Sequence, residues 1–111
     1  MKIDKHENYI VLTDERNDVA NFAAFLERKV PASFEEDNLV INLMEFTSFS
    51  LDQLLLFLKL SNYHRASKHS FVIANDAINP DDVPFEMVVV PTLQEAGDII
   101  AMEDIERDLG F

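Results

Sequence analysis

Short apolar runs alternate with longer amphipathic stretches along the chain. Residues 39–43 (LVINL), 71–75 (FVIAN) and 87–90 (MVVV) are rich in β-branched residues and apolar at nearly every position. This pattern is typical of strands that are covered on both faces or central in a sheet. A shorter strand candidate, residues 9–12 (YIVL), ends at the polar run TDERND.

The first helix is predicted directly after this polar run. Apolar residues recur at helical spacing, at Val19, Phe22, Leu26 and Val30. The side chain of Asp18 can cap the first amides, so a helix is expected over residues 19–29. Pro31 is expected to end it, because proline disfavours helical geometry in the residue before it.

A leucine-rich run begins after Ser50 and predicts a helix over residues 51–67. With the strands on either side, it forms a strand–helix–strand unit, which implies parallel strands and a right-handed crossover. Four leucines can face the sheet: Leu51, Leu54, Leu55 and Leu58. Leu56 and Leu60 lie on the far side with Tyr63 beside them. A helix that is apolar almost all round is either sandwiched, here by the C-terminal segment, or offers a surface to another chain.

A third helix is predicted after Pro91. Thr92 and Glu95 have the spacing of a capping box, in which each side chain accepts from the other residue's amide. Two apolar faces then follow on nearly opposite sides: Leu93, Ala96 and Ile100 on the first, and Met102, Ile105 and Leu109 on the second. We therefore expect a bend near residues 101–103 and a separate packed segment over residues 102–109, which Gly110 stops.

These elements predict the α/β class, with a mixed, mostly parallel four- to five-stranded sheet and helices packed mainly on one face. The chain of 111 residues fits a single domain, 1–111. Its 48% hydrophobic residues, two glycines and four prolines are unlike the composition of a disordered chain.

The formal net charge of −12 opposes direct binding to a nucleic-acid backbone. The only basic cluster, residues 64–69 (HRASKH), is short, and Arg107 is the single base among ten acids from Phe71 onward. A solvated acidic face is the favoured interpretation, and a basic protein partner stays open. The sequence shows no signal peptide and no apolar run near the ~20 residues that span a bilayer, so we expect a cytoplasmic protein without a membrane partner.

No residue set indicates a catalytic, cofactor or metal site. The chain has no cysteine, which excludes disulfides and thiolate chemistry. His64 and His69 are five residues apart and fall on different faces of a helix, so we interpret the histidines as ordinary surface residues. Acid pairs such as Asp81–Asp82 and Glu103–Asp104 suit a turn and a charged helix face. We therefore expect no enzymatic activity.

In chain order, these elements resemble the STAS domains, the sulfate transporter and anti-sigma factor antagonist family. The resemblance covers residues 9–101 and rests on order and spacing. Its most specific parts are VINLMEFTSFSLDQLLLFL, which is similar to the family's strand, loop and Asp-Ser-Ser-Gly-Leu helix start, and VVVPTLQEA, which is similar to its last strand and helix. The resemblance implies a STAS-like fold and a regulatory protein.

Antagonists of this family are switched by a kinase that phosphorylates a serine at the helix start. Matching NLMEFTSFSLDQLLL to the signature places Ser50 at its Asp, Leu51 at the first Ser, Asp52 at the phosphorylated Ser and Gln53 at the Gly. The acceptor hydroxyl is thus replaced by a permanent carboxylate, which the helix dipole favours by about 0.3–1 kcal/mol. Either Ser50 and Gln53 form an ordinary capping box with a well-placed acid, or the module is held in a state like the phosphorylated form.

The chain also resembles small acidic bacterial proteins that end in RDLGF and carry the name ribonuclease Z. That enzyme needs a zinc-binding His-x-His-x-Asp-His run, which this sequence lacks. We interpret the name as borrowed from a neighbouring gene.

Our leading hypothesis is a non-enzymatic protein–protein interaction module whose partner is a protein such as a kinase-like anti-sigma factor. The expected partner-binding residues are Phe49, Ser50, Asp52, Gln53, Leu56, Leu60 and Tyr63. The alternatives are an accessory protein of an RNA-processing enzyme and an acidic mimic that binds a basic protein surface. A homodimer also stays open.

Overall fold

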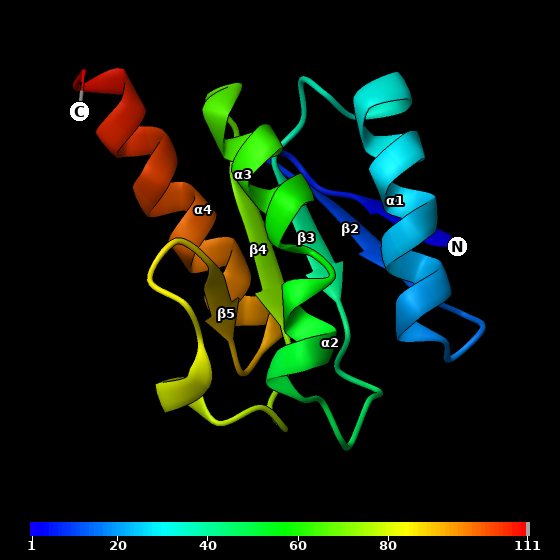
Figure 1. Cartoon of the computed structure of the whole chain (residues 1–111). Helices are drawn as coiled ribbons and strands as arrows, with labels where there is room; N and C mark the ends of the chain where they lie inside the picture. The colour runs from blue at the N-terminus through cyan, green and yellow to red at the C-terminus, as the bar shows by residue number, and fades with distance from the viewer. Residues whose placement is uncertain (111) are drawn as a thin grey trace.

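A computed structural model describes residues 1–110 of the chain (Figure 1). The elements, in order, are β1 (Lys2–Lys5), β2 (Ile10–Thr13), α1 (Val19–Ser33), β3 (Leu39–Asn42), α2 (Leu51–Leu55), α3 (Leu58–Ala66), β4 (Phe71–Ala74), the 3₁₀ turn η1 (Pro80–Asp82), β5 (Val88–Val90) and α4 (Leu93–Asp108). The described range thus contains the predicted strands and one more, β1.

The five strands form one sheet in the order β1-β2-β3-β4-β5. β1 pairs antiparallel with β2, and the pairs from β2 to β5 are parallel. The predicted class, a mixed and mostly parallel sheet in an α/β fold, is confirmed. β1 was not predicted because each of its residues is exposed and it carries no apolar run.

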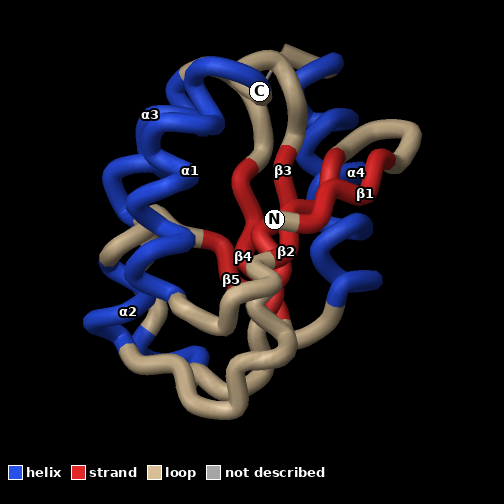
Figure 2. Tube along the Cα trace, turned by 90° about the vertical axis from the view of Figure 1, so that its right-hand side faces the viewer, coloured by secondary structure: helices blue, strands red, loops and turns tan. Residues whose placement is uncertain are grey.

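The sheet is covered on both faces. Leu39 and Ile41 of β3 point into a core shared with α1, α2 and α3, whereas Val40 between them points into a second core against α4. The neighbouring strands repeat this alternation in register, because side chains along a strand point to opposite faces. Figure 2 shows α1, α2 and α3 on one side of the sheet and α4 on the other.

Helix α1 continues through Pro31, so the prediction that this proline ends the helix is wrong. Proline lacks only its own N–H, and the amide of Phe34 still bonds to the carbonyl of Val30 at 2.8 Å. Val30 and Phe34 are both buried against the sheet. Their burial holds the last turn in helical form despite the missing bond.

The predicted helix over residues 51–67 is divided into α2 and α3 by a turn at Leu56 and Phe57. Its buried face was also wrongly predicted, because the five consecutive apolar residues 54–58 single out no face. The buried residues are Leu54, Phe57, Leu60, Ser61 and His64. These residues are spaced by three and four, as on one face of a helix. The pattern is hard to recognise in the sequence because two of them, Ser61 and His64, are polar. Leu51 and Leu55, expected to face the sheet, are instead exposed.

Helix α4 runs unbroken from Leu93 to Asp108, so the expected bend near residues 101–103 is absent. Of the two predicted apolar faces only the first meets the sheet, through Ala96 and Ile100, which are fully buried, whereas Leu93 is exposed. Met102, Ile105 and Leu109 therefore face solvent, with exposed fractions of 50%, 60% and 67%. The predicted second packed segment does not form.

Replacing Leu60 by Ala should lower the free energy of unfolding by about 2–5 kcal/mol, because Leu60 is only 3% exposed. The matched change of Leu56, which is 43% exposed, should cost less than about 0.5 kcal/mol. Urea unfolding of the two variants measures both values. Equal losses would contradict this assignment of the buried face.

Candidate partner-binding site

The junction before α2 is a complete capping box. The hydroxyl of Ser50 accepts from the amide of Gln53 at 3.2 Å, and the Gln53 side-chain oxygen accepts from the amide of Ser50 at 3.0 Å. This confirms the local geometry predicted from the sequence. The equivalent prediction for α4 is half right, since Thr92 accepts from the amide of Glu95 but only that one bond is present.

Buried contacts hold the loop from β3 to Ser50 in one conformation. The side-chain amide of Asn75, itself buried at the end of β4, donates to the carbonyls of Leu43 at 2.8 Å and Phe46 at 3.0 Å. Phe49 is only 5% exposed and belongs to the core under α1–α3. The expectation that Phe49 lies on an accessible docking surface is therefore wrong, because its ring anchors the loop.

An exposed apolar patch follows the capping box. Leu51, Leu55 and Leu56 are exposed by 36%, 40% and 43%, and Asp52 among them is exposed in the first turn. Asp52 and Leu56 are four residues apart, as are Leu51 and Leu55. Residues at this spacing are neighbours on a helix surface, so the four side chains lie close together. We call these four residues the α2 surface.

Tyr63 and Leu60 lie beyond the helix break and belong to another feature. With Glu27, Pro31 and Lys59 they line a hollow of about 150 Å³ between α1 and α3. The Tyr63 hydroxyl donates to the Glu35 carboxylate at 3.0 Å, and this bond raises the pKa of Tyr63. Leu60 forms the buried floor of the hollow, so its predicted outward position is wrong, whereas Leu56 and Tyr63 are exposed as predicted.

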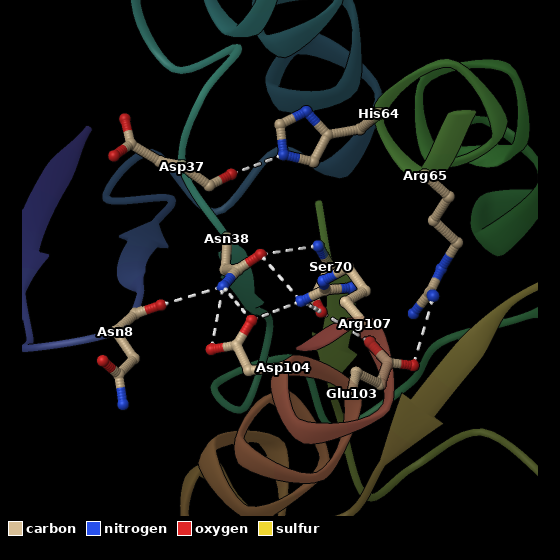
Figure 3. Close-up of polar contacts among 9 residues, drawn as sticks. All are labelled: Asn8, Asp37, Asn38, His64, Arg65, Ser70, Glu103, Asp104 and Arg107. Atoms are coloured by element: carbon tan, nitrogen blue, oxygen red, sulfur yellow. Dashed lines mark hydrogen bonds and ion pairs between the residues drawn. The ribbon is translucent and has the colours of Figure 1, made fainter. Parts of the chain in front are cut away.

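A polar network that the sequence did not reveal lies at the opposite end of the sheet, beside the amino ends of the parallel strands (Figure 3). Asn38, just before β3, accepts from the Ser70 amide at 2.8 Å and from Arg107 at 3.3 Å. Its amide group donates to the Asn8 carbonyl and to Asp104, both at 3.1 Å. One side chain thereby joins the amino ends of three strands to α4.

Two ion pairs complete this network. Arg65 of α3 contacts Glu103 of α4 at 3.2 Å, and Glu103 also accepts from the Ser70 hydroxyl at 2.5 Å. Arg107 pairs with Asp104 on α4 itself. These contacts hold the C-terminal half of α4 to the fold, so we assign them a structural role.

His64 is fully buried, which contradicts its interpretation as a surface residue. Its Nε2 lies 2.6 Å from the carbonyl of Asp37, an acceptor, and therefore carries the proton. Its Nδ1 and the hydroxyl of Ser61 have no hydrogen-bond partner within residues 1–110. Burial lowers the pKa of His64, and the nearby His69 and Arg65 add to this effect, while the hydrogen bond to Asp37 and its charge oppose it.

Within residues 1–110, no group of three His, Asp or Glu side chains is placed to hold a metal ion. Over the same range, no helix has both the length and the apolar character needed to cross a bilayer. The chain matches no protein-family model and no curated protein. The candidate site therefore follows from the geometry of its own residues.

The buried histidine gives the fold a pH dependence of definite sign. Because the pKa of His64 is lowered on folding, the unfolded chain binds its proton at a higher pH, near the ordinary value of about 6.5. The contribution of His64 to the free energy of unfolding should be constant above that pH and fall as the pH drops towards the folded-state pKa. Urea unfolding of the protein between about pH 7.5 and pH 5 measures this loss.

The matched variant is His64→Gln, whose amide can still donate to the Asp37 carbonyl but does not titrate. Its unfolding free energy should change less with pH than that of the natural protein. Parallel pH profiles for the two proteins would assign the dependence to other groups.

Proposed function

We propose that the chain is a non-enzymatic, STAS-like interaction module that docks a partner protein through the α2 surface. The observation that carries this proposal is the exposure of Leu51, Leu55 and Leu56 around the carboxylate of Asp52. Exposed apolar clusters with a polar group among them are typical of protein-binding sites. The order and spacing of the elements, which resemble those of anti-sigma factor antagonists, support the same function.

The rigidity of the junction also supports docking. The capping box fixes the start of α2, and the buried Phe49 and Asn75 fix the loop that leads to it. A surface held in one conformation loses little entropy when a partner binds. Asp52 and the three leucines would thus be presented in their binding geometry before any contact.

Asp52 occupies the position at which the resemblance expects a phosphorylated serine. Asp52 supplies an acidic group without any modification, so binding that depends on an acidic group at this position would need no kinase. A complementary partner would have a basic or hydrogen-bond-donating group that contacts Asp52. Apolar side chains around that group would contact the leucines. A kinase-like anti-sigma factor is the partner class that the resemblance implies.

Affinity capture from the native host, followed by binding measurements on the purified partner, tests this proposal. Asp52→Lys should weaken binding at least tenfold, because it places a like charge against the basic group that the proposal requires. Leu55→Ser with Leu56→Ser should have a similar effect, since truncated central contacts cost about 1–2 kcal/mol or more.

Two controls separate binding from folding. Ser50→Ala should lower stability by about 0.5–2 kcal/mol through the lost cap and weaken binding much less than Asp52→Lys, because it removes no contact group from the α2 surface. Met102→Ser removes an equally exposed apolar side chain from α4. A partner that binds the Asp52 and leucine variants as tightly as the natural protein would refute docking at the α2 surface.

A further inference from the structure

The two edges of the sheet differ in how they are protected. β1, at one edge, carries Lys2, Asp4 and Lys5 and only one apolar residue, Ile3. Charged side chains, lysine above all, discourage the pairing of an edge strand with another chain. β5, at the other edge, is a run of three valines, each half-buried, and it has no charge.

The backbone of β5 has one residue directed outward. The carbonyl of Val90 accepts from the amide of Asn75 at 3.0 Å, so the polar groups of Val90 face β4. Backbone groups alternate in direction along a strand of a parallel pair, so those of Val88 also face β4, and the N–H and C=O of Val89 face the open edge. No further strand of the described residues lies beyond it.

A groove of about 520 Å³ accompanies this edge. The β4–β5 loop forms one wall with Val83, Pro84 and Phe85, and Ile99 of α4 contributes to the other. The Phe85 ring is fully exposed and buries none of its apolar surface within the fold. The groove thus combines unpaired backbone groups with apolar side chains, the two features that bind an extended peptide.

The acidic residues around the groove indicate which kind of peptide segment it would bind. Asp76 lines the groove, Asp81, Asp82 and Glu86 lie on the same loop, and all four are exposed. Between Phe71 and Glu106 the sequence has no Lys or Arg. A second copy of the chain would bring two acidic loops together, which is repulsive, whereas a basic segment would be attracted.

We propose that β5 binds an extended segment of another protein by strand addition, and that this segment is apolar at alternate positions and basic at its ends. The segment exchanges hydrogen bonds with the N–H and C=O of Val89 and packs a side chain against Phe85. The pairing is short, because β5 spans only about 10 Å and Pro91 has no N–H to continue it. The residues involved are separate from the α2 surface, so this site goes beyond the function proposed above.

Backbone amide exchange of the full chain tests the site directly. The probe is a synthetic peptide of alternating valine and threonine with two lysines at each end. Without it, the Val89 amide should exchange faster than those of Val88 and Val90, and addition of the probe should slow the Val89 amide at least tenfold. The same peptide with its central amides N-methylated should bind about an order of magnitude more weakly, since it cannot donate to β5.

Two variants locate the binding to this edge. Val89→Pro removes the outward N–H and suits an edge strand, whereas Val88→Pro removes an N–H that faces β4 and should lower stability. Phe85→Ser changes a side chain that the fold does not use. Val89→Pro and Phe85→Ser should each weaken peptide binding several-fold with the thermal midpoint of Phe85→Ser unchanged.

Three results would overturn the proposal. If the N-methylated peptide binds as tightly as the unmethylated one, the binding would come from charge attraction alone and not from strand pairing. Exchange that slows at α2 and not at Val89 would place the peptide elsewhere. Protection of Val89 that rises with protein concentration in the absence of peptide would assign the edge to a second copy of the chain.

Discussion

The structure depends on the burial of the central strands on both faces. In β2, β3 and β4 successive side chains enter different cores, one against α1–α3 and the other against α4. Parallel strands that are apolar in this way are stable only when helices cover both sides. The crossovers through α1 and through α2–α3 supply one layer, and α4, which follows the last strand, supplies the other. Between β4 and β5 the chain returns without an α-helix, by a loop that carries η1, and among the described residues no strand lies beyond β5.

Local signals in the sequence predicted the elements well. The apolar runs located β2, β3, β4 and β5 to within a residue or so, and the caps at Asp18, Ser50 and Thr92 located the starts of helices. These features depend on residues within one helical turn or one strand, so a short window of sequence contains them. β1 could not be predicted in this way, because it has no apolar run of its own. It is a strand because it pairs with β2.

The errors have a common physical origin in contacts between distant residues. Pro31 should end a helix by local rules, yet the burial of Val30 and Phe34 maintains it. Helix α4 should bend to bury its second apolar face, but Asn38, Ser70 and Arg65 bind its carboxylates and arginine and keep it straight. The members of that polar network come from five separate segments, and no spacing in the sequence connects them. The capping box at Ser50 was predictable for the opposite reason, since both partners lie within four residues.

The strand order also bears on how the chain reaches its native state. Because the sheet runs β1-β2-β3-β4-β5, every strand pairs with the strand that precedes it in the sequence. The sheet can therefore grow from the N-terminus strand by strand as the chain leaves the ribosome, with each crossover helix adding its cover in turn. Only the layer made by α4 must wait until all five strands have been made. Until α4 emerges, the valines of β2, β3 and β4 on that face are uncovered, and the nascent chain is then most exposed to aggregation and to chaperones.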